Sequence, residues 1–217
     1  MNSKAILIGA GGHARVVAEL ARLNNIEILG LVDIGLGQNT FWDNGIKCLG
    51  SDEVINNFSP QEIDLLNGIG TLPGKSDTRC SVFNKFKACG FSFPPLIHPR
   101  AIVSSETQIE AGVQIMAGAI INPKARIGEN TIINSGAIIE HDCIINEHVH
   151  VAPGAVLSGS VTLKQNVHIG TGAVIIQNII IEESSIVGAG AIITQNVMRN
   201  HIVYPARSEI KGITVLM

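Results

Sequence analysis

Residues 115–150 read IMAGAI-INPKAR-IGENTI-INSGAI-IEHDCI-INEHVH in blocks of six, and every block begins with isoleucine. The same column continues in both directions, so that all seventeen positions at this spacing from Ile97 to Ile193 hold Ile, Leu or Val. A period of six matches neither the 3.6-residue repeat of an α-helix nor a hairpin meander, because no turn signal interrupts it at strand spacing. The pattern therefore predicts a parallel β-helix over half of the chain.

A second column lies four residues after each aliphatic residue and holds small or β-branched side chains, such as Ala119, Ala137 and Cys143. Such residues fit beside a large one inside a narrow coil. Cys143 is therefore expected in the core, and all four cysteines are expected to be reduced because no CxxC pair is present. The residue directly after the aliphatic is often Gly, Asn, Glu or Ser, which predicts the corners there. This repeat resembles that of the left-handed parallel β-helix acyltransferases, in which three hexads form one triangular coil.

Composition limits the possible partners. Aromatic residues make up 4% and charged residues 15% of the chain, and the net charge is −3. This balance gives no reason to expect nucleic acid or an anionic membrane surface as a partner. No apolar run is long enough to span a bilayer, and the start shows no signal-peptide pattern. A cytoplasmic protein without membrane insertion is expected.

The first 95 residues form a different unit. A short apolar run at 5–9, an amphipathic stretch at 15–23 and a second run at 26–32 predict a β-α-β unit, and further signals predict a strand near 63–69 and a helix at 77–89. Three prolines within 93–99 end this unit. We expect a Rossmann-like α/β half-domain at 1–95, an all-β left-handed β-helix at 96–198 and a C-terminal tail at 199–217.

The first loop, Gly9-Ala10-Gly11-Gly12-His13-Ala14, combines with an acid at Asp33 to match the dinucleotide-binding fingerprint. A complete dinucleotide site needs two β-α-β-α-β halves, and one half fits before the β-helix begins. The same glycine turn and helix N-terminus form a phosphate site. A mononucleotide or a nucleotide sugar is therefore the favoured ligand over NAD.

Several motifs occur together and in order along the chain. They are GAGGH at 9–13, a strand ending in Asp33, GIG at 68–70 with Arg79 behind it, LIHP at 96–99, EHDC at 140–143 and PAR at 205–207. As a set they resemble the bacterial sugar acetyltransferases that include UDP-4-amino-sugar (bacillosamine-type) N-acetyltransferases and sialic acid O-acetyltransferases, which act in surface polysaccharide or glycan biosynthesis. The resemblance implies transfer of acetyl from acetyl-CoA to an amino or hydroxyl group of an activated sugar by a homotrimer.

The chemistry requires a base near the acceptor, because its nitrogen or oxygen loses a proton as it attacks the thioester. His141 matches the catalytic histidine of the family. Asp142 matches the acidic residue that orients this base, a position that is often glutamate in relatives. Taken without the motif, a His-Asp pair more often solvates a bend.

For acetyl-CoA, the resemblance implies contacts from His150 at the thioester end and from Thr171 and Ala189 along the pantetheine arm. For the nucleotide sugar, it implies the turn residues Gly11, Gly12 and His13, together with Asp33 and Gly70.

The remaining charged and histidine residues are expected to be structural. His148 and His168 are expected at the surface, and Arg79 is expected to be a solvated charge on its helix unless it meets a phosphate or carboxylate. A zinc site is the alternative for the histidines of the β-helix, but their spacing lacks the short H-x4-H pair of trimeric zinc enzymes of this fold. No metal is expected.

Oligomerisation has support in the sequence itself. The residue before each inward aliphatic faces outward, and every eighteenth residue shares an edge. One such stripe is entirely aliphatic, and an apolar stripe of this length would not remain in water. We expect it in a homotrimer interface; it consists of Ile102, Ile120, Ile138, Val156, Val174 and Ile192.

The leading functional hypothesis is acetyl-CoA-dependent N-acetylation of a nucleotide-linked 4-amino-4,6-dideoxy sugar by direct transfer, with His141 as general base. O-acetylation of sialic acid or a related nonulosonic acid is the nearest alternative. A sugar-nucleotide-binding scaffold without catalysis is a further alternative, against which the intact His141 and Asp142 argue.

Overall fold

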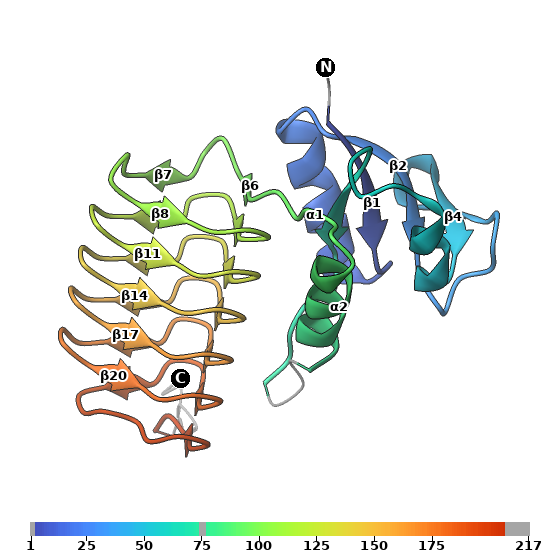
Figure 1. The fold of residues 1–217 in the computed structure, drawn as a ribbon. Helices are drawn as coiled ribbons and strands as arrows, with labels where there is room; N and C mark the ends of the chain where they lie inside the picture. The colour runs from blue at the N-terminus through green and yellow to red at the C-terminus, as the bar shows by residue number, and fades with distance from the viewer. Residues whose placement is uncertain (1–2, 74–76, 207–217) are drawn as a thin grey trace, which may run out of the picture.

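The computed structural model describes residues 3–73 and 77–206. Residues 207–217, which include Arg207 and most of the expected tail, lie outside this range. The described chain forms an α/β domain that lies against the upper coils of a long β-helix (Figure 1). Neither α1 nor α2, the α-helices within the described ranges, has the length and apolar character needed to cross a bilayer.

The N-terminal domain is a five-stranded sheet in the order β3-β4-β2-β1-β5, parallel except for the β3–β4 pair. The expected β-α-β unit is present, and its apolar residues pack between the sheet and α1. No sequence pattern indicated the short strands β3 and β4 in the connection that follows β2. The elements are β1 (Lys4–Ile8), α1 (Gly12–Leu23), β2 (Glu27–Val32), β3 (Phe41–Trp42), β4 (Ile46–Gly50), β5 (Asp64–Asn67) and α2 (Asp77–Ala88), with 3-10 turns at Asp43–Gly45 and Asp52–Asn57.

The β-helix is built from two-residue strands in three parallel sheets, which confirms the predicted fold class. The aliphatic sheet contains β7 (Ile102–Val103), β10 (Ile120–Ile121), β13 (Ile138–Ile139), β16 (Val156–Leu157), β19 (Val174–Ile175) and β22 (Ile192–Ile193). The mixed sheet contains β8 (Gln108–Ile109), β11 (Arg126–Ile127), β14 (Ile144–Ile145), β17 (Thr162–Leu163) and β20 (Ile180–Ile181). The domain-facing sheet contains β6 (Leu96–Ile97), β9 (Gln114–Ile115), β12 (Ile132–Ile133), β15 (His150–Val151), β18 (His168–Ile169), β21 (Ile186–Val187) and β23 (Ile202–Val203).

Between β6 and β22, paired strands are eighteen residues apart, so that three hexads form one coil, as Ile138 pairs with Val156 in the aliphatic sheet. The second residue of each strand points inward, and these residues form a continuous core with the small column that includes the fully buried Cys143. The expected aliphatic stripe lies in register on a single sheet. Its end members Ile102 and Ile192 are 66% and 71% exposed.

The corners differ from the expectation. The residue in the left-handed region is the third after each inward aliphatic, as at Gly118, Lys124, Asn130 and Gly136, and not the residue directly after it. Left-handed backbone costs a non-glycine residue roughly 1–2 kcal/mol, and Asn and Asp tolerate it best. This explains why Gly, Asn, Asp and Ser recur at these positions. One of them is Asp142, with φ of 59°.

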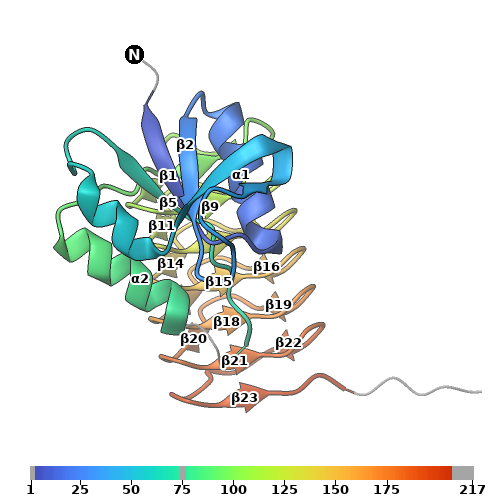
Figure 2. The same cartoon turned by 90° about the vertical axis from the view of Figure 1, so that its right-hand side faces the viewer.

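The N-terminal domain packs on the domain-facing sheet, where it covers the upper strands and leaves β18 and β21 below it (Figure 2). Leu96, Met116 and Ile132 of the β-helix belong to the same buried cluster as Val17 and Leu66 of the α/β domain. The two domains therefore share a hydrophobic core.

Arg79 of α2 is 2% exposed, so the expectation of a solvated charge is wrong. Its guanidinium donates to the carbonyls of Asn67 and Ile69 in the α/β domain and to the carbonyl of Asn130 at a β-helix corner. Burial lowers the pKa of Arg79 to about 9, so the side chain is still a cation at neutral pH. Arg79 thus joins the two domains through backbone carbonyls.

Replacement of Arg79 by alanine is expected to lower the free energy of unfolding by about 3 kcal/mol, because buried carbonyls lose a charged donor. Urea unfolding of both proteins measures this change. Arg100→Ala is the control, since Arg100 is exposed and its loss should change stability by less than about 0.5 kcal/mol. Equal stability of the Arg79 variant and the wild type would contradict the role described.

Candidate active site

A cavity of about 520 Å³ opens at the carboxyl ends of β1, β2 and β5, where the α/β domain meets the β-helix. Ligands of open parallel sheets bind at this edge. The structure brings all five expected sugar-nucleotide residues together around this cavity, and His150 of β15 joins them. The lining consists of Gly9, Ala10, Gly11, Gly12, His13, Asp33, Gly68, Ile69, Gly70, Thr71, Leu72 and His150.

The glycine turn is held in shape by Asp33. One carboxylate oxygen accepts the backbone N–H of Ala10 at 2.9 Å, and the other accepts that of Gly35 at 2.7 Å. Gly11 is the N-cap of α1 and provides no side-chain cap. The first N–H groups of α1 are thus left to a ligand, which is the arrangement that binds phosphate.

His13 stands in the first turn of α1 and reaches across the domain boundary. Its Nε2 lies 2.8 Å from Oε1 of Gln114 on β9. Burial, and secondly the nearby cation of Arg79, lower the pKa of His13 to about 4, although the bond to Gln114 opposes this shift. The ring is therefore neutral at physiological pH.

His150 forms the β-helix wall of the cavity. Nδ1 of His150 contacts Oγ1 of Thr71, and Nε2 lies 3.2 Å from Nδ2 of Asn134. Burial, followed by the neighbouring rings of His168 and His13, lowers the pKa of His150 to about 3. The His150 and His168 rings meet edge to face with centroids 4.9 Å apart. His168 is half-buried, and its Nδ1 is buried without a partner among the described residues, so the expectation of a plain surface histidine is wrong.

His141 and Asp142 lie at the corner between β13 of the aliphatic sheet and β14 of the mixed sheet. His141 Nδ1 lies 2.8 Å from Oδ2 of Asp142, and both side chains are more than half exposed. Because a carboxylate accepts only, this bond places the proton on Nδ1 and leaves the lone pair on Nε2. The left-handed backbone of Asp142 belongs to the corner, which therefore also supplies the residue that orients the imidazole.

Gly159, one coil further on, supports the His141 ring. A Cβ at this position would lie 2.7 Å from Cε1 and 2.8 Å from Nε2 of His141. The imidazole thus lies directly over the Gly159 backbone, a contact that only glycine allows.

Gly159→Ala is expected to displace the exposed His141 ring. With His141 as the expected base, kcat should fall about tenfold, because a misplaced catalytic group loses much of its effect. The backbone keeps its conformation, since the flexible ring moves instead, and the melting temperature should be unchanged. Steady-state kinetics and thermal unfolding measure the two quantities. A variant with wild-type kcat would show that the ring position does not depend on this contact.

A single chain does not bring the expected catalytic pair, His141 and Asp142, to the cavity. His141 lies at the corner between the aliphatic and mixed sheets, whereas the cavity lies on the domain-facing sheet, which is the opposite side of the triangular coil. Thr171 and Ala189 are exposed at a different corner, between the domain-facing and aliphatic sheets. The expected catalytic pair and the expected pantetheine residues Thr171 and Ala189 therefore lie at two different corners of one prism, and the expected sugar residues lie with His150 in a third place.

His148 is 7% exposed, which corrects the expectation that it lies at the surface. Its Nδ1 lies 3.0 Å from Nδ2 of Asn130, and its ring meets Phe83 of α2 edge to face. Burial is the first cause of its lowered pKa. No pattern in the sequence indicated this role, since the six-residue register places His148 at a corner and does not reveal that a helix covers it.

Residues without a sequence signal also shape the site. Thr71 follows the expected Gly70 but belongs to no motif. Asn134 directly follows an inward aliphatic, where the pattern predicts only a corner, and Gly159 has no sequence signal. Gln114 could have been found from its position, because it lies in the same outward column of the same sheet as His150.

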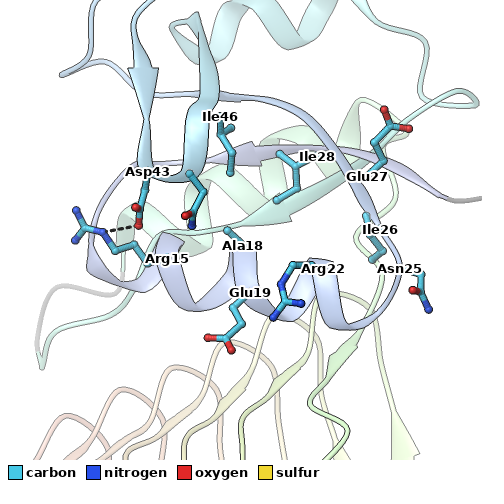
Figure 3. Close-up of a pocket in the computed structure, with 11 residues that line it drawn as sticks. Arg15, Ala18, Glu19, Arg22, Asn25, Ile26, Glu27, Ile28, Asp43 and Ile46 are labelled. Atoms are coloured by element: carbon cyan, nitrogen blue, oxygen red, sulfur yellow. Dashed lines mark hydrogen bonds and ion pairs between the residues drawn. The ribbon is translucent and has the colours of Figure 1, made fainter.

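A larger cavity of about 840 Å³ lies between α1 and the β2–β4 region of the α/β domain (Figure 3). Arg15 there is paired with Asp43 at 3.0 Å. None of the expected catalytic or binding residues lines this cavity, so we assign the site to the smaller cavity. Within the described residues, no three His, Cys, Asp or Glu side chains are grouped closely enough to hold a metal ion.

Comparison with known proteins identifies both parts of the chain. The model of the PglD N-terminal domain matches residues 4–86, and the model of the bacterial transferase hexapeptide (six repeats) matches residues 106–140 and 124–159. No curated protein matches the sequence significantly.

Solved structures align over nearly the whole chain. A histidine-to-alanine mutant of GDP-perosamine N-acetyltransferase from Caulobacter crescentus, in complex with CoA and GDP-perosamine, has 31% identity and a TM-score of 0.86, with 97% of this chain and 98% of that chain covered. The acetyltransferase domain of PglB from Neisseria gonorrhoeae, in complex with acetyl coenzyme A, has 32% identity and a TM-score of 0.84, with 95% and 99% covered. WeeI from Acinetobacter baumannii, with 24% identity, a TM-score of 0.81 and 93% and 96% covered, shares the fold.

Proposed function

The chain belongs to the sugar N-acetyltransferases of the hexapeptide-repeat family, and we propose that it transfers the acetyl group of acetyl-CoA to the 4-amino group of a nucleotide-linked 4-amino-4,6-dideoxy sugar. The observation that carries this proposal is the cavity between the glycine turn and His150. It combines N–H groups at a helix N-terminus, which suit a diphosphate, with two neutral imidazoles, His13 on α1 and His150 at the β-helix wall. Similarity over the whole chain to an enzyme solved with GDP-perosamine and CoA supports the same ligand class.

In the proposed reaction, the amine nitrogen of the sugar attacks the thioester carbonyl carbon and forms the C–N bond. His141 Nε2, whose lone pair faces away from Asp142, accepts the proton that the amine loses. The tetrahedral intermediate then expels the CoA thiolate, which takes up the proton held by His141 as the C–S bond breaks. No metal takes part in these steps.

In a trimer, site residues that lie far apart within one chain could meet at the boundary between two subunits. When the aliphatic sheets of three prisms face a common three-fold axis, the corner that holds His141 in one subunit meets the corner that holds Thr171 and Ala189 in the next. The coenzyme arm would lie along this seam. His141 would then approach the cavity of the neighbouring subunit, whose wall is His150. The exposed aliphatic side chains of that sheet support this packing.

The experiment that tests the function incubates the purified protein with acetyl-CoA and a panel of acceptors, and follows the release of free thiol. The panel contains UDP-, dTDP- and GDP-linked 4-amino-4,6-dideoxy sugars, with free and CMP-linked sialic acids as hydroxyl acceptors. Turnover confined to the amino sugars is expected. Turnover confined to the sialic acids would replace the proposal with O-acetylation, and a protein inactive on the whole panel would favour a binding scaffold.

A further inference from the structure

Gln114 is a buried amide that connects the two domains at the cavity, with 2% exposure. Its Nε2 donates to the backbone carbonyl of Asn67 at 2.8 Å, and its Oε1 lies 2.8 Å from His13 Nε2. A backbone carbonyl accepts hydrogen bonds and cannot donate them. The carbonyl of Asn67 therefore fixes which end of the Gln114 amide faces the imidazole, and that end is the oxygen.

The orientation of Gln114 determines the protonation of His13. An amide oxygen needs a donor, so His13 Nε2 must bear a hydrogen. The ring is neutral because of its burial and the buried cation of Arg79, which lower the pKa of His13 to about 4. A neutral imidazole with its hydrogen on Nε2 carries a lone pair on Nδ1. No described residue donates a hydrogen bond to this Nδ1, and the ring lines the cavity.

We propose that Gln114 is a positioning residue that holds His13 in the neutral Nε2–H tautomer, so that His13 Nδ1 accepts a hydrogen bond from a hydroxyl or N–H group of the bound nucleotide sugar. The identity of the ligand rests on the function proposed above, whereas the tautomer does not depend on it. A phosphate oxygen cannot occupy this position, because it offers no proton to the lone pair. The diphosphate therefore belongs at the glycine turn, and a sugar, ribose or base donor belongs at His13.

The tautomer is tested directly by NMR on the full chain with isotope-labelled histidine, because the two ring nitrogens give different 15N signals when they bear a proton. His13→Asn, which removes the signal, assigns it. A neutral ring with the proton on Nε2 at pH 7 is expected. A proton on Nδ1, or an imidazolium at pH 7, would overturn the assignment to Gln114.

Two replacements of His13 separate the roles of its nitrogens. Asparagine places an amide near the position of Nδ1 and retains an acceptor for the ligand, whereas glutamine places its amide near Nε2. We expect His13→Asn to keep the KM for the nucleotide sugar within about threefold, and His13→Gln to raise it about tenfold, the effect of one lost hydrogen bond. Equal effects of the two variants, or the reverse order, would refute ligand binding through Nδ1.

Gln114 itself is tested by two variants. Gln114→Met removes the amide and should raise the KM for the nucleotide sugar about fivefold while leaving the KM for acetyl-CoA unchanged. Gln108→Met on the mixed sheet is the matched control, since Gln108 is exposed in the same outward column position and should have no effect. An unchanged KM for the nucleotide sugar in Gln114→Met would overturn the proposal.

Gln114→Glu keeps the shape of the side chain. It tests the proposal even if Gln114→Met fails to fold. A carboxylate beside the ring raises the pKa of His13, against the opposing charge of Arg79, and the protonated ring loses its acceptor. Substrate affinity should therefore improve as the pH is raised through the new pKa, a trend that the wild type lacks near neutrality. A flat profile in this folded variant would contradict the mechanism. If the wild type acetylates no nucleotide sugar but shows the Nε2–H tautomer, the proposed function has failed and the tautomer assignment is supported.

Discussion

Replacing His141 by alanine is expected to lower kcat for acetyl transfer about 10³-fold, the usual contribution of a general base. The ring is half-exposed at a corner and is not part of the core, so its removal should not alter the melting temperature. The KM values for acetyl-CoA and the nucleotide sugar should change little, because we assign ligand binding to the cavity residues and to Thr171 and Ala189, and only proton transfer to His141. Stopped-flow or steady-state measurement of thiol release gives both parameters.

Asp142→Asn is the companion variant. It keeps the size of the side chain but can donate to Nδ1, which would move the imidazole proton to Nε2 and remove the lone pair from the acceptor side. A smaller loss of kcat than that of His141→Ala is expected. Wild-type kcat in His141→Ala would refute His141 as the base. A rise in KM at unchanged kcat would make His141 a binding residue instead.

Placing a carboxylate at Val156, in the middle of the aliphatic stripe, is expected to dissociate the proposed trimer. In a three-fold assembly each copy would bury an unpaired charge, which costs several kcal/mol per site. Light scattering should show a fall in mass from three times the 23.0-kDa chain to one. Acetyl transfer should disappear at the same time, because His141 and the cavity of one chain lie on opposite sides of the prism.

Ile138→Asp should behave in the same way as Val156→Asp, since the two positions pair directly. Ile144→Asp is the matched control on the mixed sheet, where Ile144 is 41% exposed, and it should remain trimeric and active. A trimer that survives Val156→Asp would show that another face forms the interface. A monomer with full activity would refute the shared active site.

The β-helix could be predicted from the sequence because its cause is local and repeated. Each hexad contributes one inward aliphatic and one small residue, and stacking at a spacing of eighteen follows from that pattern alone. The left-handed corner residues were misplaced by two positions, because polarity indicates a bend without showing which residue carries the positive φ.

The cavity was predicted in part. Gly11, Gly12, His13, Asp33 and Gly70 were expected together from an ordered set of motifs, and the structure gathers them around one cavity. Their roles in binding remain predictions.

The sequence by itself determined the two kinds of fold, the core column, the outward aliphatic stripe and the proximity of His141 to Asp142, all of which depend on neighbours in the chain or on a fixed period. The tertiary structure alone decided how the α/β domain sits on the domain-facing sheet. That contact buries Arg79 and His148, makes His150 a wall of the cavity and joins His13 to Gln114. The residues that meet in these contacts are up to 101 positions apart in the chain, and their spacing follows no period. Their pKa values and hydrogen bonds are set by burial that arises only when the two domains meet.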